Sequence, residues 1–286
     1  MSFNFLEIGY GVKSNFLPHI LCKKTLGKVH SVFQSSFNIV IQNNLVHFGS
    51  LGIPLSAFGI NIPKSDLELL LNTIQPGNSI QLNDTIIKID TMNHRFIIKL
   101  DMLTEVDLRL NRLKYNVENI KNSEIVKLMN EIDLIRDSGV VQSSKETSLI
   151  NEIIHARPGN KRLSKACIEH FFGRGIGLTP SGDDFISGLI MVETSFSSHS
   201  YWQDELREFL SSHANSTTDV SCNYFYSLLN GYVSENFKDL LSNLAESVEK
   251  AKAKRLVNNI LSYGHTSGID TLLGIQVALK QLTHCV

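Results

Sequence analysis

The sequence predicts an α+β fold, with a β-rich N-terminal region of antiparallel strands followed by a mostly α-helical C-terminal region. In about the first hundred residues, short runs of β-branched and aromatic residues are separated by turn residues. From about residue 105, apolar residues instead recur at the spacing of three and four that helices require. Because strands and helices do not alternate, we expect no doubly wound parallel sheet. The expected domains are residues 1–105 and 106–286.

The N-terminal strands are predicted from composition and from the turns between them. They are expected at residues 31–33, 37–42, 45–48, 79–82, 85–90 and 96–100. Asn43-Asn44 is a plausible hairpin turn, and residues 83–84 and 92–95 are turn-like. One helix is expected to interrupt the strands, starting near Ser65 and stopping before Pro76.

The C-terminal helices are predicted from apolar periodicity. They are expected at residues 125–135, 147–155, 164–172, 183–192, 204–210, 220–229, 245–261 and 271–282. A basic run from Lys250 to Arg255 has the composition of a solvated helix face, with an anion-binding role as the alternative.

Composition limits the class of protein. The chain has 286 residues, of which 42% are hydrophobic and 19% charged, which is typical of a globular protein and not of a disordered one. The formal net charge of -1 argues against a nucleic-acid-binding protein, because neutralising phosphates requires a basic excess.

Cysteine spacing and hydropathy point to the cytoplasm. The four cysteines (Cys22, Cys167, Cys222 and Cys285) are far apart, so we expect reduced thiols rather than disulfides or a zinc site. The N-terminus does not resemble a signal peptide. The most apolar stretch, residues 185–192, is too short to span a bilayer, so we expect no membrane association.

Two similar glycine-rich segments are the most informative part of the sequence. The first runs from Gly177 to Gly188 and the second from Gly264 to Gly274. If Pro180 is skipped, both read Gly-x-Thr-Ser-Gly-x-Asp-x-x-x-Gly. Each is expected to be a tight loop that leads directly into a helix, with Ser181 or Ser267 as the N-cap.

The glycines within these segments have two expected roles. Because glycine weakens a helix by about 1 kcal/mol relative to alanine, its presence at both Gly188 and Gly274 suggests that the two helices cross closely there. Gly182 and Gly268 would let a ligand approach the backbone. Valine at either position is therefore expected to abolish ligand binding with a modest loss of folding.

Both loops are expected to present free backbone N–H groups and hydroxyls at a helix N-terminus, which suits a phosphate or carboxylate. We predict that Ser181 and Ser267 line one cleft, where two helix dipoles could hold a dianion. The carboxylates of Asp183, Asp184 and Asp270 would repel a bare anion. They could orient a donor group of the ligand, cap the helices, or bind Mg²⁺ that bridges to the anion, and these alternatives stay open. We assign no metal ligands.

A third polar stretch, residues 212–221, precedes an apolar helix. A ligand role and an ordinary helix cap are both open for its Thr217, Thr218 and Ser221. The sequence contains no P-loop, Rossmann fingerprint, HExxH motif or nucleophile elbow.

The chain resembles a bacterial family that includes AllH, the H subunit of the oxamate carbamoyltransferase of anaerobic allantoin breakdown. The resemblance rests on Gly177-Leu-Thr-Pro-Ser-Gly-Asp-Asp184, Thr217-Thr-Asp-Val-Ser221 and Gly264-His-Thr-Ser-Gly-Ile-Asp270. In the N-terminal half it rests on His30-Ser-Val-Phe33 and Pro54-Leu-Ser56, so it covers nearly the whole chain.

The resemblance implies a subunit of a carbamoyltransferase in purine degradation that acts on carbamoyl phosphate and oxamate together with partner subunits. In this interpretation His265, Asp184 and Asp270 are the candidate catalytic residues. His265 would donate to developing charge, the two aspartates would orient the amide of the ligand, and Arg174 would clamp phosphate. The candidate ligand-binding residues are Arg174, Gly177, Thr179, Ser181, Gly182, Asp183, Thr217, Thr218, Ser221, Gly264, Thr266, Ser267 and Gly268.

Two other functions compete with this one. The chain could be a non-catalytic partner that needs its ligand only for assembly or regulation, since the sequence shows no activated nucleophile. It could also be a Mg²⁺-dependent hydrolase that uses Asp183 and Asp184, although adjacent residues on a helix point about 100° apart. The sequence does not determine the true substrate, the oligomeric state or any cofactor other than the Mg²⁺ of this alternative.

Overall fold

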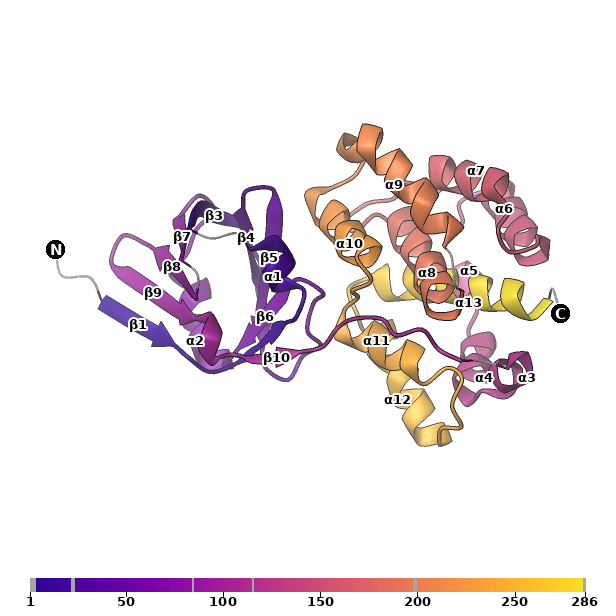
Figure 1. The fold of residues 1–286 in the computed structure, drawn as a ribbon, viewed down its shortest axis with the longest axis horizontal. Helices are drawn as coiled ribbons and strands as arrows, with labels where there is room; N and C mark the ends of the chain where they lie inside the picture. The colour runs from indigo at the N-terminus through magenta and orange to yellow at the C-terminus, as the bar shows by residue number, and fades with distance from the viewer. Residues whose placement is uncertain (1–3, 22–23, 84, 115, 198–199, 285–286) are drawn as a thin grey trace. The chain divides into compact units, whose positions relative to one another are not determined.

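The computed structural model describes residues 4–21, 24–83, 85–114, 116–197 and 200–284. The chain forms two compact units, residues 1–109 and 110–286. The first contains the strands and the second most of the helices, as the element labels in Figure 1 show. The α+β class, with strands first and helices later, is therefore confirmed.

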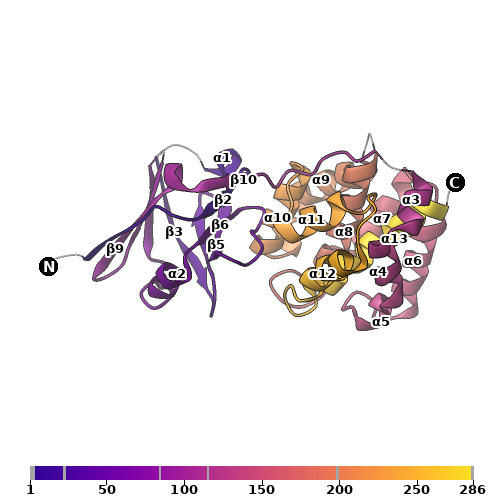
Figure 2. The ribbon, with the colours of Figure 1, turned by 90° about the horizontal axis from the view of Figure 1, so that it is seen from below.

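The N-terminal unit is built on one curled, ten-stranded sheet (Figure 2). Its strands are β1 (Asn4–Ile8), β2 (Val12–Ser14), β3 (Thr25–Val32), β4 (Phe37–Ile41), β5 (Asn44–Ser50), β6 (Gly59–Ile62), β7 (Ser79–Asn83), β8 (Ile86–Asp90), β9 (His94–Lys99) and β10 (Thr104–Val106). Their order is β1-β9-β8-β7-β3-β4-β5-β6-β2-β10. Helices α1 (Leu17–Ile20) and α2 (Lys64–Leu71) and a 3-10 turn at Leu100–Met102 complete the unit.

The sheet is mixed, so the expectation of purely antiparallel strands is wrong. The pairs β1/β9, β2/β10 and β5/β6 are parallel. Hairpin signals identify only antiparallel neighbours, whereas these pairs need longer connections. Residues 51–58, for example, carry the chain back so that β6 runs alongside β5.

The first hairpin turn lies one residue earlier than predicted. Ile41 pairs with Asn44, so Gln42 and Asn43 form the two-residue loop. Gln42 has a φ of 56°, in the left-handed region that such loops use. The predicted turn at residues 83–84 includes Asp84, which lies outside the described residues, as do Cys22 and Cys285.

The C-terminal unit contains α3 (Val117–Asn122), α4 (Glu124–Glu131), α5 (Leu134–Asp137), α6 (Ser144–His155), α7 (Lys161–Phe171), α8 (Ser181–Phe196), α9 (Tyr201–His213), α10 (Asp219–Leu229), α11 (Glu235–Ser242), α12 (Lys250–Leu261) and α13 (Ser267–His284). A 3-10 turn at Ala214–Ser216 leads into α10. Helices α8 and α13 are buried along most of their length and form the centre of the core.

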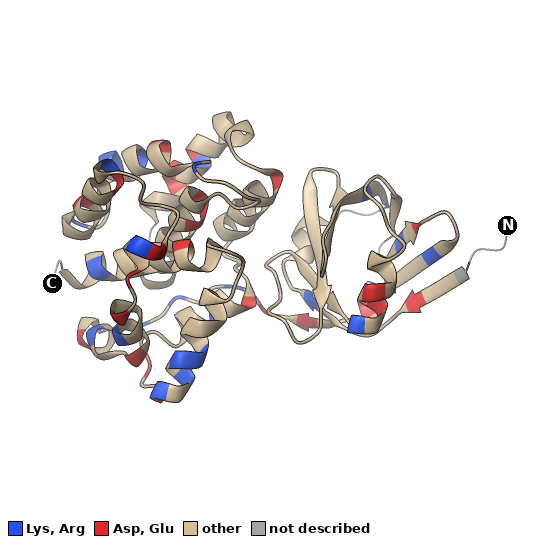
Figure 3. Ribbon diagram, turned by 180° about the vertical axis from the view of Figure 1, so that it is seen from behind, with Lys and Arg blue, Asp and Glu red and all other residues tan. Residues whose placement is uncertain are grey.

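Two helices have different bounds from those predicted. The helix expected over 125–135 breaks after α4, because the Asp133 side chain accepts a hydrogen bond from the Arg136 N–H and starts α5. The helix expected from residue 245 begins only at Lys250. The basic run on α12 is exposed as predicted, and it appears as the blue band on the lowest helix of Figure 3.

Candidate functional site

The two glycine-rich loops meet at the core of the C-terminal unit. The first connects α7 to α8 and the second connects α12 to α13. The Thr179 hydroxyl donates a hydrogen bond of 3.3 Å to Oγ of Ser267, so the loops are in direct contact. The two motifs therefore lie side by side, but the prediction that Ser181 and Ser267 line one cleft fails at Ser181, which does not line the pocket described below.

The close crossing of α8 and α13 is confirmed at the two predicted glycines. A Cβ atom placed on Gly188 would lie 2.2 Å from the Thr271 carbonyl oxygen. A Cβ atom on Gly274 would lie 2.2 Å from the Phe185 carbonyl oxygen. Only glycine allows this backbone approach, which fixes the relative positions of both helix N-termini.

Each aspartate of the paired motifs is hydrogen-bonded by the serine of the other motif. The carboxyl of Asp184 interacts with the hydroxyls of Ser267 and Thr179. The carboxyl of Asp270 interacts with the hydroxyls of Ser181 and Thr266. The two motifs therefore hold each other through a reciprocal pair of serine–aspartate contacts.

The helices do not begin with the predicted serine caps. Ser181 and Ser267 are the first helical residues, and Pro180 occupies the N-cap position of α8 without a side-chain cap. Because both hydroxyls are engaged by the aspartate of the other motif, they do not cap their own helix. The capping-box interpretation is therefore wrong at Ser181.

The amide groups expected to bind an anion are used within the protein. The Gly182 N–H donates to the Arg174 carbonyl at 2.8 Å, and the Gly268 N–H donates to the Tyr263 carbonyl at 3.0 Å. The next turn is closed in the same way, since the Asp184 N–H donates to the Pro180 carbonyl at 3.1 Å. The expectation of free amides is therefore wrong at Gly182, Asp184 and Gly268.

The expected effect of valine at Gly182 or Gly268 also changes. A Cβ atom would lie 1.9 Å from the Phe171 carbonyl oxygen at Gly182 and 1.8 Å from the Ile260 carbonyl oxygen at Gly268. Both glycines pack against the preceding helix, so neither leaves a path by which a ligand could reach the backbone. Substitution there would disrupt folding severely rather than modestly.

A pocket of about 410 Å³, including the space at its mouth, opens beside this junction. Its polar lining includes Thr179, Asp184, Ser187, Tyr224, Tyr263 and Ser267. Its apolar lining includes Met191, Leu228, Val233 and Phe237. Among the described residues, no lysine, arginine or histidine lines it, so it suits an uncharged group with hydrogen-bonding atoms.

Asp184 is the chemically distinctive group of the pocket. It is 9% exposed, and its Oδ2 atom has no hydrogen-bond partner among the described residues. Burial raises the pKa of its carboxyl well above the ordinary value, although hydrogen bonds from Ser267 and Thr179 oppose that rise. The nearby Asp270 carboxyl adds to the rise through charge repulsion. A buried acceptor without a partner is costly, so this oxygen is suited to a ligand donor.

Two tyrosines in the lining of the same pocket are in direct contact through their hydroxyls. The hydroxyls of Tyr224 and Tyr263 are 2.9 Å apart. Burial, followed by the contact with Tyr224, raises the pKa of Tyr263 well above its ordinary value, so this phenol stays protonated. Sequence patterns did not identify these tyrosines, because they lie within α10 and after α12 with no recognisable motif.

Asp270 is the buried counterpart of Asp184. It is fully buried, and its Oδ1 atom accepts a hydrogen bond of 2.8 Å from the Gly139 N–H. Burial raises the pKa of Asp270, whereas hydrogen bonds from Ser181 and Gly139 oppose that rise. Gly139 lies in the loop before α6 and was not identified from the sequence.

Asp183 is enclosed by hydrogen bonds within the protein. Its carboxylate accepts from the Gly173 N–H at 2.7 Å, and it also accepts from the hydroxyls of Thr217 and Ser221. The Thr218 hydroxyl caps α10 by accepting from the Ser221 N–H at 3.0 Å. The third polar stretch thus connects α8 to α10 through Thr217 and caps α10 through Thr218, which agrees with the helix-cap alternative.

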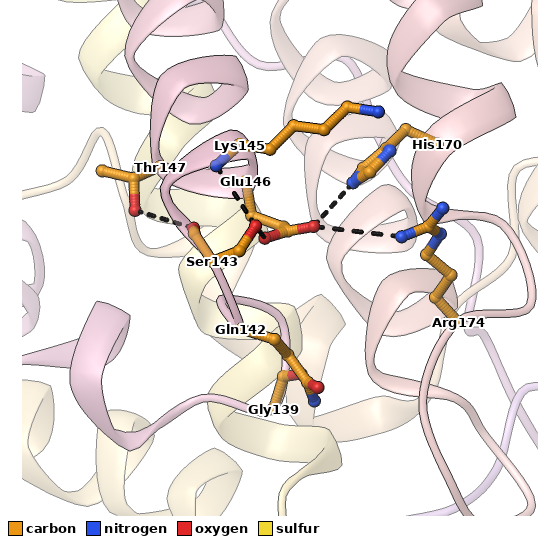
Figure 4. Close-up of polar contacts among 8 residues, drawn as sticks. All are labelled: Gly139, Gln142, Ser143, Lys145, Glu146, Thr147, His170 and Arg174. Carbon is orange, nitrogen blue, oxygen red and sulfur yellow. Dashed lines mark hydrogen bonds and ion pairs between the residues drawn. The ribbon is translucent and has the colours of Figure 1, made fainter.

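Arg174 lies on the exposed part of the first loop. Its guanidinium faces Glu146 at 3.9 Å, and the same Glu146 Oε1 atom is 2.8 Å from His170 Nε2 (Figure 4). A hydrogen bond from Ser143, the largest influence, lowers the pKa of Glu146 to about 2. Arg174 is therefore placed beside a charged carboxylate that the sequence analysis missed.

The remaining predicted residues lie outside the pocket lining. Gly177, Gly264 and His265 are exposed, and neither His265 nor Ser181 lines the pocket. Gly177 and Gly264 have φ values of 103° and 67°, which shape their loops. The structure thus brings Thr179, Asp184 and Ser267 together in the pocket and places His265 on the surface.

The acidic residues of the site do not fit a shared Mg²⁺ ion. Asp183 faces Gly173 and Thr217, whereas Asp184 faces Ser267 and Thr179. Within the described part of the chain, no group of three or more His, Cys, Asp or Glu side chains could hold a metal ion. No described helix is long and apolar enough to cross a membrane.

Comparison with known proteins identifies two matching family models. The model described as oxamate carbamoyltransferase subunit AllH matches residues 171–279, which include both glycine-rich loops and the pocket. The model of the AllH family N-terminal domain matches residues 7–105, which include most of the sheet. No solved structure matches the chain.

Proposed function

Because the chain belongs to the AllH family, a family of carbamoyltransferase subunits, we propose that it binds a substrate of oxamate carbamoyltransferase in the pocket beside Asp184. The candidate ligands are oxamate, its carbamoylated product oxalurate, and carbamoyl phosphate. Each carries an N–H-bearing amide or carbamoyl group next to an anionic group. The family description implies that other subunits complete the enzyme.

One observation carries the proposal: Asp184 lines a pocket shared by both family motifs, and its buried Oδ2 atom has no hydrogen-bond partner among the described residues. Carbamoyl transfer requires no covalent bond to the protein, so a subunit can contribute by positioning its substrate. Asp184 would orient the ligand, and the hydroxyls of Thr179 and Ser267 would hold the carboxyl in place.

The charge of the pocket restricts how an anionic substrate can lie in it. A carboxylate or phosphate against Asp184 would meet a like charge without a cation in the described lining. We therefore place the anionic group at the mouth, where a partner subunit is its candidate contact. The setting we propose is a cytoplasmic complex of allantoin and purine catabolism.

The test is calorimetric titration of the chain, alone and in complex with its partner subunits, with oxamate, oxalurate and carbamoyl phosphate. We expect one of them to bind at millimolar or lower concentration, and Asp184→Leu to weaken that binding at least tenfold. Absence of binding by both preparations would refute the proposal.

A non-catalytic role is the second candidate, and it has one specific observation in its favour. Ile176 and Leu178, both in the first loop, are 93% and 49% exposed, so this loop presents neighbouring apolar side chains that a partner subunit could cover. In this case Ile176→Ser would prevent assembly of the complex. Asp184→Leu would then leave the turnover of the assembled complex unchanged, whereas the leading proposal requires that turnover to fall.

A further inference from the structure

The C-terminal unit contains an internal structural repeat. Helix α7, its following loop and α8 correspond to α12, its loop and α13. In each copy, the glycine after the first helical serine packs on the last turn of the preceding helix, with its Cβ position 1.9 Å from the Phe171 oxygen or 1.8 Å from the Ile260 oxygen. The same glycine N–H donates to an equivalent loop carbonyl, that of Arg174 or Tyr263. The two copies therefore use the same local architecture.

The repeat makes Asp184 and Asp270 structurally equivalent. Asp184 is held by Ser267 of the other copy and Thr179 of its own, and Asp270 by Ser181 of the other copy and Thr266 of its own. Both are buried, and burial raises the pKa of each. The two carboxyls consequently share the same kind of hydroxyl contacts and should share the same preference for a further partner.

The two equivalent carboxyls differ in what faces them. At Asp270, the loop before α6 inserts Gly139, whose peptide N–H donates to Oδ1 at 2.8 Å, while Oδ2 has no partner among the described residues. Gly139 packs so tightly that a Cβ atom there would lie 2.3 Å from Ser181 Oγ. At Asp184, no protein N–H takes the corresponding role in the described chain, and the carboxyl instead lines the pocket.

We infer that Asp184 recognises a neutral amide N–H of the ligand, in the way that Asp270 recognises the Gly139 peptide N–H. This inference rests on the proposed function and names the end of the substrate that enters the pocket. The carboxamide N–H2 of oxamate, or the carbamoyl N–H2 of its relatives, would donate to Asp184 Oδ2. Asp184 is thus assigned as the residue that distinguishes an amide from a ligand of equal charge without N–H groups.

The surroundings favour an amide over the other possible partners of a buried carboxyl. A phosphate or carboxylate would be repelled, and a small cation would lose its hydration to a single carboxyl among apolar side chains such as Met191 and Phe237. A neutral amide has a smaller desolvation cost, and whichever of the Tyr224 and Tyr263 hydroxyls does not donate to the other could donate to its carbonyl. The ligand class is therefore a primary amide or carbamoyl group.

The test compares oxamate with pyruvate, which has the same charge and nearly the same size but carries a methyl group in place of the N–H2. Titration calorimetry of the intact chain, or of its complex with partner subunits, should show oxamate bound at least about tenfold more tightly than pyruvate. In Asp184→Leu, the two affinities should become similar. In the control Asp137→Asn, an exposed aspartate outside the lining, the preference should be unchanged.

The outcomes separate the two proposals. Equal affinity of the native protein for oxamate and pyruvate would overturn the amide inference while leaving the proposed pocket in place. If the protein binds neither ligand and also binds no other substrate of the transferase, both proposals are overturned. Should Asp184→Leu fail to fold, the comparison on the native protein decides alone, because it requires no substitution.

Discussion

Gly188 and Gly274 lie against each other where α8 crosses α13, so closely that a Cβ atom on Gly188 would lie 2.9 Å from the Gly274 Cα atom. This crossing fixes the N-terminal turns of both helices, from which Asp184 and Asp270 extend. The geometry of the pocket therefore depends on two residues that do not line it.

Gly188→Ala should destabilise the protein. Alanine normally favours a helix by about 1 kcal/mol over glycine, but here it must separate two helices, at a cost of about 1–3 kcal/mol or more. Urea unfolding should show the lower stability. Gly9→Ala is the control, because its Cβ would meet only the exposed side chain of Met102, at 3.1 Å. Stability equal to that of the native protein in Gly188→Ala would contradict the close crossing.

Gly139→Ala should be destabilising through its contact with Ser181. The added methyl would lie 2.3 Å from Ser181 Oγ but 3.2 Å from Ser181 Cβ, so removing that hydroxyl should partly restore stability. We expect the double variant Gly139→Ala/Ser181→Ala to be more stable than the sum of the two single effects. Additive effects in a double-mutant cycle would show that Gly139 does not pack on this hydroxyl.

The Asp184 carboxyl should contribute a loss of stability as pH rises above the ordinary aspartate pKa of 3.8, because burial raises its pKa in the native state. The native state then binds the Asp184 proton more tightly than the unfolded chain does. The free energy of unfolding therefore decreases as pH rises from the unfolded pKa through the raised native pKa. Asp184→Asn should reduce this slope. The free energy of unfolding, measured by urea between pH 4 and pH 8, provides the check, and an unchanged slope would refute this role of Asp184.

Thr217→Val should reduce stability by about 1–3 kcal/mol, because it removes a hydroxyl that donates to the buried Asp183. Thr147→Val, at a partly exposed position on α6, is the matched control. Since Asp183 faces away from the pocket partners of Asp184, oxamate affinity of the folded variant should stay within about twofold. A large loss of affinity without a loss of stability would instead assign Thr217 to the ligand site.

The sequence was most informative where a local pattern determines a local structure. Helix α2 and the two glycine loops were predictable because glycine and proline breakers and apolar periodicity act over a few residues. The four buried residues of β6 show no alternation, so this strand was missed. Its parallel pairing with β5 depends on a returning connection that leaves no short-range signal.

The site was predictable in its motifs but not in its roles. The repeated Ser-Gly-x-Asp pattern located Asp184 and Asp270, yet it could not show that each serine contacts the aspartate of the other copy. Nor could it show that Gly139, more than a hundred residues away in sequence, faces one aspartate only. These contacts arise from the helix crossing, which is a tertiary feature.

The most direct test of the central claim is a crystal structure of the chain, alone or with its partner subunits, in the presence of oxamate. We predict electron density for oxamate within hydrogen-bond distance of the Asp184 carboxyl, with its carboxylate toward the mouth of the pocket. Oxamate bound elsewhere in an active complex, with only water beside Asp184, would contradict the assignment of this pocket as the substrate site.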